Sequence, residues 1–97
     1  MSYVVAATYT ATPGEEENIL SNLEAMISPT RAEPACQVYI PHRSQEDPSV
    51  FFLYEEYRDE DGFKAHVASE HFERHIKNGV WPRLAERQRV IATPLAD

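Results

Sequence analysis

Cysteine and glycine are both scarce in this chain of 97 residues. The one cysteine, Cys36, cannot form an internal disulfide, and it alternates with Val38 and Ile40 in a strand-like pattern. We therefore expect a small buried side chain here in preference to a catalytic thiol. The 3 glycines form no phosphate-binding loop or Rossmann fingerprint, and no Ser-His-Asp order occurs. The obvious nucleotide, Rossmann-flavin and hydrolase classes are thereby excluded.

Basic residues are also few, since 9 Lys and Arg stand against 16 Asp and Glu, for a formal net charge of -7. This balance disfavours a nucleic-acid surface and binding to anionic membranes, because both need clustered cations. No run reaches the length of a transmembrane helix, and the start of the chain lacks the basic region and sustained apolar run of a signal peptide. We expect a cytoplasmic protein with a single domain over residues 1–97.

The first third of the chain predicts a strand followed by a helix. Residues 3–10, YVVAATYT, are β-branched, aromatic or small, which is typical of a strand. Thr12, ahead of Pro13 and Glu15, predicts a helix that begins with a capping box. We expect this helix to weaken at residues 28–29, where a proline follows a serine, and a further helical turn before Pro34 stays open. One apolar stripe at three- and four-residue steps indicates that the helix is amphipathic: Ile19, Leu20, Leu23, Met26 and Ile27.

Two strands joined by a short turn are expected next. Residues 35–43 alternate in polarity, and Pro41 indicates that this strand is bent or lies at a sheet edge. The following strand, from residue 50 to 57 or 58, has apolar or aromatic side chains on both faces. The turn between them, residues 44–49, is short and predicts an antiparallel hairpin.

The segment after Asp59 predicts two helical pieces. In one straight helix, Phe72 would lie nearly opposite Phe63, so the two could not both face one sheet. We expect the break at Ser69, which would cap the second piece. That piece is expected to end at residues 78–79, Asn followed by Gly.

An apolar connection, residues 80–82, then leads to a fourth predicted strand at residues 87–93. The order of elements predicts an α+β fold of the ferredoxin-like βαββαβ type, a four-stranded antiparallel sheet with the helices on one face. The other face is left uncovered. Because the first and third strands are apolar, or nearly so, on both faces, we expect this uncovered face to pack against a second copy in a homodimer.

His66 is the side chain best placed for chemistry, because its spacing from Phe63 and Val67 puts an imidazole on the apolar face of a helix. The alternative is a core histidine whose ring nitrogens are satisfied. Glu55 and Tyr57 share one face of their strand, which is directed either to the helices or to the dimer interface. Glu55 either orients His66 or is a structural acid bonded to backbone amides.

Aromatic residues are the candidate substrate-binding side chains, although strand aromatics commonly belong to the core. They are Tyr39, Tyr54, Phe63, Phe72 and Trp81. Four arginines either meet an anionic substrate or pair with the many acids, and ion pairs are the default on an acidic protein. These are Arg31, Arg83, Arg87 and Arg89.

His71 and His75 are spaced to share a helical face, which permits metal binding. No third ligand of clear spacing accompanies them. We therefore expect no metal.

Three segments carry a resemblance to a known family: TRAEPAC (residues 30–36), VYI (residues 38–40) and EDPSVFFLYEEYRDEDGFKAHVASEHF (residues 46–72). They resemble the antibiotic biosynthesis monooxygenase family. The resemblance implies a dimeric α+β barrel and cofactor-independent oxygenation of polycyclic phenols and quinols. The family also contains haem-degrading enzymes and proteins that act on a phosphorylated signalling sugar derivative.

By this resemblance, Glu55 matches the acid of the family's third strand and Tyr57 matches an aromatic that is often Trp. His66 matches the histidine of the following helix. These three are our candidate catalytic residues.

Two departures from the family pattern have consequences. Ala35 stands where the family usually has Gly, which implies either strain or an altered turn. The haem-degrading branch carries Asn where Ala7 stands, and its haem-ligating histidine falls near Ile76. Haem is therefore not expected.

We expect a cofactor-free monooxygenase that oxidises a quinol or phenolic polycyclic aromatic with dioxygen. Neutral His66 would take a phenolic proton, and the resulting anion would pass an electron to dioxygen inside an enclosed pocket. The expected partners are the small aromatic substrate, dioxygen and a second copy of the chain. Two alternatives stay open: a small-molecule-binding barrel without turnover, and an isomerase or lyase that uses His66 as a proton shuttle on a small oxygenated metabolite.

Overall fold

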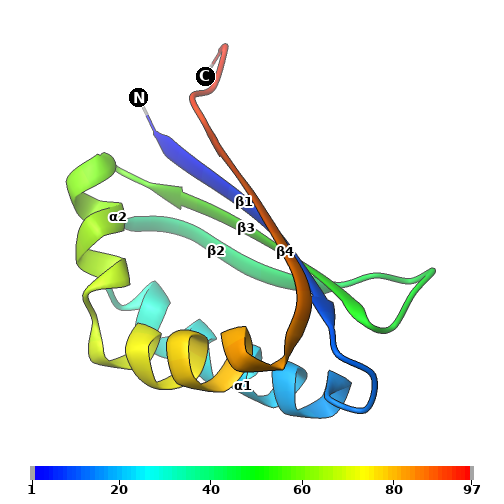
Figure 1. Cartoon of the computed structure of the whole chain (residues 1–97). Coiled ribbons are helices and arrows are strands. Elements are labelled where there is room, and N and C mark those ends of the chain that lie inside the picture. The colour runs from blue at the N-terminus through cyan, green and yellow to red at the C-terminus, as the bar shows by residue number, and fades with distance from the viewer. Residues whose placement is uncertain (1, 97) are drawn as a thin grey trace.

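The computed structural model describes residues 2–96. Its elements are β1 (Tyr3–Ala11), α1 (Glu16–Arg31), β2 (Cys36–Arg43), β3 (Val50–Tyr57), α2 (Glu60–Val67), the helical segments η1 (Phe72–Val80) and η2 (Trp81–Arg83), and β4 (Leu84–Ala92). The strands form one antiparallel sheet in the order β2-β3-β1-β4, with the helices on one face (Figure 1). The predicted ferredoxin-like order is confirmed. Within residues 2–96, no helix is both long and apolar enough to cross a membrane.

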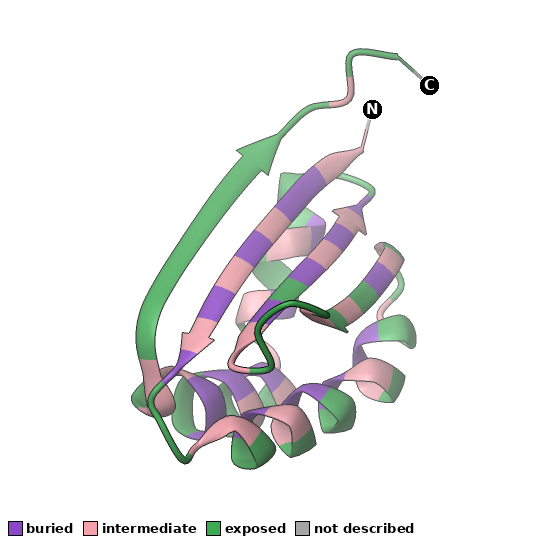
Figure 2. Cartoon of the chain, turned by 90° about the vertical axis from the view of Figure 1, so that its right-hand side faces the viewer, coloured by how far each residue is buried: buried purple, intermediate pink, exposed green. Residues whose placement is uncertain are grey.

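The core lies between the sheet and the helices. Alternate residues of β1 and β3 are buried, as the bands along both strands in Figure 2 show. The register pairs Ala7 with Leu53 and Tyr9 with Phe51, and all four belong to the core. Because Glu55 shares the parity of Leu53, it faces the helices and not the uncovered side. From the helical layer, α1 contributes the buried residues Ile19, Leu23, Met26 and Thr30.

The start of α1 differs from the prediction. The capping box at Thr12 is wrong, because the N-cap is Glu15 and its side chain makes no capping hydrogen bond. Residues 12–15 form a tight turn in which the Glu15 N–H donates to the carbonyl of Thr12 at 3.0 Å. Within it Gly14 adopts a φ of 91°. A residue in this left-handed region cannot belong to a right-handed helix, so α1 begins only after it, at Glu16.

The end of α1 lies before Pro34, as the sequence allowed, but the helix runs through Pro29 to Arg31 without the expected interruption. Tertiary contacts hold this last turn. The guanidinium of Arg31 donates from Nε and Nη2 to the carbonyl of Tyr39 at 3.1 and 2.9 Å. A proline so near the helix end removes one intrahelical hydrogen bond, and these contacts to β2 offset its loss.

The predicted break at Ser69 is confirmed. Its Oγ donates to the carbonyl of His66 at 2.6 Å and accepts the N–H of Phe72 at 3.2 Å. The side chain thus links the end of α2 to the first turn of the next helical piece. From Phe72 onward this piece is wound more widely than an α-helix.

Gly79 does not stop the second helical piece as predicted. A Cβ at this position would lie 2.5 Å from Oδ1 of Asn22 on α1, so glycine permits a close approach of the two elements. The segment ends instead at Val80, and β4 starts earlier than predicted. Leu84 pairs with Ala11 across an irregularity in β1, which extends the sheet at this end.

Ala35 is accommodated by an altered turn and not by strain. None of the non-glycine residues that the structure describes has a positive φ. The methyl group of Ala35 instead packs against Gly62 of α2, where a Cβ would lie 2.5 Å from the Cβ of Ala35. The carbonyl of Ala35 accepts the N–H of Arg58 at 2.9 Å, which ties the turn to the end of β3.

The sheet face opposite the helices is uncovered in the single chain. It exposes three large apolar side chains: Ile40 is 42% exposed, Phe52 38% and Val90 61%. These residues lie on the opposite parity from the buried pairs, since Ile40 is opposite Tyr54 and Phe52 is opposite Thr8 in the register. β4, at the sheet edge, is exposed along almost its entire length (Figure 2).

Candidate active site

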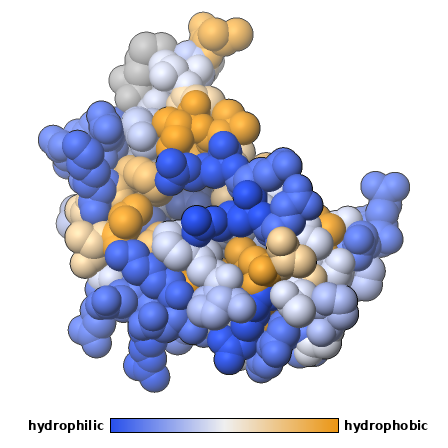
Figure 3. Space-filling model, viewed as in Figure 1, coloured by the Kyte–Doolittle hydropathy of each residue, from blue (hydrophilic) through white to orange (hydrophobic). Residues whose placement is uncertain are grey.

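A cavity of about 400 Å³ lies between the sheet and the chain from α2 to β4, within the range of about 300–1,000 Å³ typical of small-molecule sites. Figure 3 shows this side of the molecule hollowed beside hydrophobic side chains, with hydrophilic ones at its rim. Glu55 is the only acid among the described residues of the lining. The lining residues are Val5, Ala7, Tyr9, Glu55, Phe63, Val67, Phe72, Trp81, Arg87, Gln88 and Arg89.

Glu55 projects from β3 into the wall of this cavity and is only 5% exposed. The hydroxyl of Tyr57 donates to its Oε1 at 2.7 Å, and Nε2 of His66 lies 3.7 Å from the same oxygen. Burial raises the pKa of Glu55, while the Tyr57 hydrogen bond and the charge of His66 partly oppose that rise. The site therefore holds a carboxyl group that accepts a proton more readily than an exposed one.

His66 faces the interior as predicted, but it does not line the cavity. It is 1% exposed, and its ring is enclosed by those of Tyr57 and Phe72, with centroids 5.2 and 5.1 Å away. Phe63 stacks at 6.2 Å. Glu55 lines the cavity and His66 lies behind it, so a direct contact of His66 with a substrate stays a prediction.

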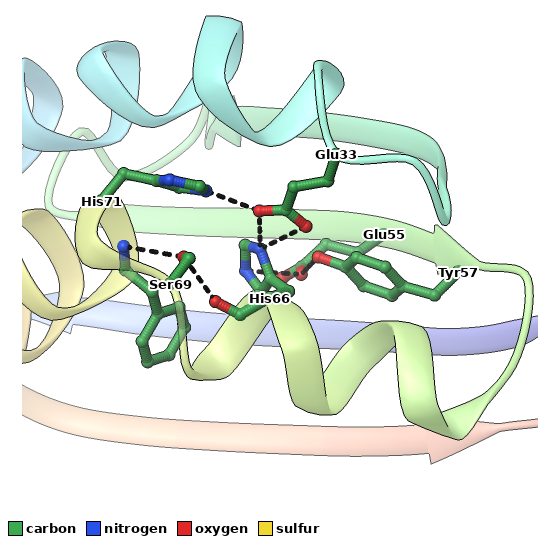
Figure 4. A network of polar contacts seen from close by, with 7 residues as sticks. Glu33, Glu55, Tyr57, His66, Ser69 and His71 are labelled. Atoms are coloured by element: carbon green, nitrogen blue, oxygen red, sulfur yellow. Dashed lines mark hydrogen bonds and ion pairs between the residues drawn. The ribbon is translucent and has the colours of Figure 1, made fainter.

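Glu33 is the site residue that sequence reasoning missed. It lies in the connection between α1 and β2, where its carboxylate is 2.9 and 3.2 Å from Nδ1 of His66 and also contacts Nε2 of His71 (Figure 4). A loop position has no periodicity, so no local pattern separated it from the other acids. Its place in segment 30–36, which carries the family resemblance, is the one available signal.

The contacts of Glu33 orient the ring of His66. Because the carboxylate accepts the Nδ1 hydrogen, Nε2 of the neutral ring presents a lone pair toward Glu55. Glu33 also stabilises the positive charge when Nε2 takes a proton. Figure 4 shows the ring between the two carboxylates, one on each side. His71, the other partner of Glu33, is partly exposed, so titratable groups extend from the cavity to the surface.

Glu33, His66 and His71 also present ligand atoms within 4.8 Å of one another. Divalent metals accept such a donor set, but here the carboxylate is hydrogen-bonded to both rings. His75 is not part of this group: its Nδ1 lies 3.0 Å from Oδ1 of Asn22 on α1. That no metal is used stays a prediction.

Phe63, Phe72 and Trp81, three of the predicted substrate-binding aromatics, line the cavity. The rings of Phe72 and Trp81 meet edge to face with centroids 5.6 Å apart. Tyr57 lies outside the lining and reaches the cavity only through its hydrogen bond to Glu55. Of the three candidate catalytic residues, Glu55 alone belongs to the cavity lining.

Tyr54 and Tyr39 lie outside the lining of this cavity, so their substrate-binding role stays a prediction. Alternation along β3 sends Tyr54 to the uncovered face, where its hydroxyl donates to Oε2 of Glu56 at 2.8 Å. Tyr39 is buried in the core, and burial raises the pKa of its hydroxyl. The aromatic that takes their place is Tyr9 of β1, which sequence reasoning did not select because the strand pattern left its inward face undecided.

Cys36 agrees with the expectation of an unreactive thiol. It is partly buried and packs against the core. Burial and the nearby charge of Glu33 raise the pKa of the thiol to about 11, which disfavours the nucleophilic thiolate.

A family model described as antibiotic biosynthesis monooxygenase matches residues 2–78. The chain belongs to the antibiotic biosynthesis monooxygenase family. The fold agrees with this assignment: PA3566 from Pseudomonas aeruginosa is 32% identical, with 98% of this chain and 95% of that chain covered and a TM-score of 0.92. Rv0793 from Mycobacterium tuberculosis is 26% identical over 100% of this chain and 98% of that chain, also with a TM-score of 0.92.

A third solved structure, described as an antibiotic biosynthesis monooxygenase, is 26% identical over 99% of this chain and 100% of that chain, with a TM-score of 0.90. No curated protein matches the chain. Membership of the antibiotic biosynthesis monooxygenase family supports a monooxygenase-like or small-molecule-binding role.

Proposed function

We propose that this protein is a cofactor-independent monooxygenase that oxidises a quinol or phenolic aromatic with dioxygen. The observation that carries the proposal is Glu55: a buried carboxyl group with a raised pKa lines an otherwise mostly aromatic and apolar cavity. Family membership supports the same class of activity. A cavity of about 400 Å³ suits a small aromatic molecule.

The proton step begins at Glu55, which accepts the phenolic hydrogen of the bound substrate. Because the pKa of Glu55 is raised, it lies closer to the pKa of a phenol, and this smaller difference in pKa favours the proton transfer. His66 can then take the proton on Nε2, once the 3.7 Å separation shortens to a hydrogen bond. Glu33 stabilises the resulting imidazolium, as the orienting acid does in other acid-histidine pairs. His66 thus acts through Glu55.

The oxygen step needs no external reductant. The phenolate passes one electron to dioxygen, and the radical and superoxide combine at a ring carbon that bears hydrogen, which forms a carbon–oxygen bond. The peroxide anion takes a proton from the protonated acid pair, and the ring carbon loses its own hydrogen as a proton while the O–O bond breaks. Quinol and dioxygen thereby give a hydroxyquinone and water. The apolar cavity excludes water from the radical pair.

The test is oxygen uptake by purified, metal-free protein against a panel of quinols and related phenols, such as 1,4-dihydroxynaphthalene and anthrone (the keto tautomer of a phenol), with spontaneous oxidation subtracted. We expect Glu55→Gln and His66→Ala each to lower the catalysed rate by about 10²–10⁴-fold, the usual contribution of a general base. Glu56→Gln is the matched control, since this neighbouring acid faces the opposite side of β3 and should leave the rate unchanged.

Three results would contradict the proposal. Ligand-induced thermal stabilisation without oxygen uptake would identify a binding barrel without turnover. Turnover under nitrogen would identify an isomerase or lyase. Equal losses of the catalysed rate in Glu55→Gln and Glu56→Gln would show that the carboxyl group of Glu55 has no specific role in the reaction.

We also propose that the uncovered sheet face packs against a second copy. Ile40, Phe52 and Val90 supply the apolar surface that such contact would bury. A chain of 97 residues builds only a modest core alone, and a dimer enlarges it.

A further inference from the structure

Two arginines of β4 face the cavity. Arg87 and Arg89 are two residues apart, so their side chains leave the same face of the strand, and both belong to the cavity lining. In the register they lie opposite Tyr9 and Ala7, which also line the cavity. Both arginines are exposed, so their guanidinium groups stand at the open side, whereas Glu55 is buried.

Neither of these arginines forms an ion pair with an acid among residues 2–96, although the chain is rich in acids. Other arginines do so: Arg43 pairs with Glu17 at 3.1 Å, Arg83 with Glu15 at 3.1 Å and Arg58 with Asp59 at 3.6 Å. The default expectation of ion pairs is therefore wrong for Arg87 and Arg89. A neighbouring acid, Glu86, points to the other face of β4, where it accepts from Gln88.

The two guanidinium groups lie instead over aromatic rings of the cavity wall. Cζ of Arg87 is 3.9 Å from the ring centroid of Trp81, and Cζ of Arg89 is 5.9 Å from that of Phe63. Stacking of this kind orients a guanidinium but leaves its N–H donors directed outward along the plane. Both guanidinium groups thus lie at the cavity, and neither forms an ion pair with an acid among residues 2–96, although the charge of Arg89 lowers the pKa of Glu55.

We propose that the natural ligand of this cavity carries an anionic group, a carboxylate or a phosphate, that Arg87 and Arg89 bind. The proposal rests on the proposed function for the hydroxyl end of the molecule. Glu55 repels an anion but accepts a hydrogen bond from a hydroxyl, so the ligand enters with its hydroxyl inward and its anionic group at the mouth. The ring system lies between, against Phe63 and Phe72.

The charge of the whole chain makes the arginine pair necessary for such a ligand. With a formal net charge of -7, the protein repels anions over its surface. A bidentate guanidinium contact supplies a local attraction that matches the planar geometry of a carboxylate. The substrate class is thus an aromatic acid or phosphate ester with a hydroxyl at the opposite end.

Calorimetric binding tests this without any turnover. The probes are 6-hydroxy-2-naphthoate and its neutral counterpart, 6-hydroxy-2-naphthamide, which differ mainly in charge. We expect the wild type to bind the acid more tightly than the amide. Arg87→Gln and Arg89→Gln should each weaken binding of the acid by about tenfold, the share of one charge-assisted contact, and leave the amide within about twofold.

The matched control is Arg74→Gln, which removes the same charge from an exposed position outside the cavity. Arg89→Lys should retain part of the preference for the acid over the amide, because lysine keeps the positive charge but cannot make a bidentate guanidinium contact. Equal binding of acid and amide by the wild type would overturn the proposal. So would a loss in Arg74→Gln as large as in the cavity variants, since that loss would report net charge alone.

A second pair of probes, 2-naphthyl phosphate and 2-naphthoate, distinguishes the two anionic groups. Tighter binding of either one, abolished in the double variant Arg87→Gln/Arg89→Gln, supports the proposal and names the group. No preference over 2-naphthol for either probe counts against it. Because binding is measured, absence of oxygen uptake would contradict only the proposed function, and absence of anion preference would contradict only this inference.

Discussion

Glu55 is a carboxyl group in a place where its charge is costly. Its pKa is raised by burial, and this indicates that the folded protein favours the protonated form more than the unfolded chain does. Such a group contributes stability below the unfolded pKa, and that contribution is lost as the pH rises through the folded pKa. A site built to take a proton is therefore also a weak point of the fold near neutral pH.

We predict that Glu55→Gln is more stable than the wild type at about pH 7 and that the difference shrinks as the pH falls below about 4, because the carboxyl group then becomes protonated in the unfolded chain as well as in the folded protein. The amide is nearly isosteric and still accepts the hydrogen bond of Tyr57. Thermal unfolding measures the effect, and about 1 kcal/mol corresponds to a midpoint shift of about 4–8 °C in a domain of this size.

Glu56→Gln is the control for this prediction, because Glu56 lies on the uncovered face beside Tyr54. Its midpoint should follow the wild type at both pH values. A midpoint of Glu55→Gln below that of the wild type at neutral pH would show that the ionised carboxylate is a net stabilising group.

At the scale of elements, the turn between α1 and β2 and the first turn of α2 fit together around one methyl group. Ala35 occupies the space that Gly62 leaves open, and the side chain of Asp59 accepts the N–H of Gly62 at 2.8 Å to cap α2. Glu33 lies in the same turn, so the packing that places Ala35 also places the carboxylate that contacts His66.

We predict that Gly62→Ala destabilises the protein by about 1–3 kcal/mol, because the new methyl overpacks against that of Ala35. Adding Ala35→Gly should recover most of the loss, since it removes the opposing methyl. Denaturant unfolding of the two single variants and the double variant gives the coupling between the positions. Additive losses in the double variant would mean that the two methyl groups do not clash.

At the scale of the whole molecule, the sheet has one face covered by helices and one face left open. Ile40, Phe52 and Val90 expose apolar area on the open face, where water is an unfavourable neighbour. Packing against an identical face would bury this area in both copies at once, as a twofold interface does.

We predict that the wild type is a dimer in solution and that Phe52→Glu shifts it to monomer, because two carboxylates would be buried at the interface without partners. Light scattering after size exclusion gives the mass directly. Leu95→Glu is the matched control: Leu95 is as exposed as a side chain can be and lies in the tail after β4, so the same substitution there should leave the dimer intact. A monomeric wild type would contradict the prediction.

Much of this architecture follows from local signals in the chain. Strand alternation, the apolar stripe of α1 and the break at Ser69 each depend on residues close in sequence, and they suffice for the βαββαβ order. Helical spacing led to the candidate His66, and the family resemblance over residues 30–36 and 46–72 supported it and added Glu55 and Tyr57. Local patterns failed where a tertiary contact overrode them. Pro29 predicts a weakened helix, but the hydrogen bonds of Arg31 to β2 stabilise the helical turn that contains it.

By itself, then, the sequence determined which side chains share a face and where elements break, because these depend on backbone periodicity and capping. The tertiary structure decided which face of β3 turns toward the helices, and so placed Glu55 at the cavity and Tyr54 on the uncovered face. Alternation along a strand assigns residues to two faces but does not say which of the two is buried. It also brought the loop residue Glu33 to His66, and it placed Arg87 at the cavity without an ion-pair partner among residues 2–96. Contacts between distant segments are properties of the packed chain, and no local pattern encodes them.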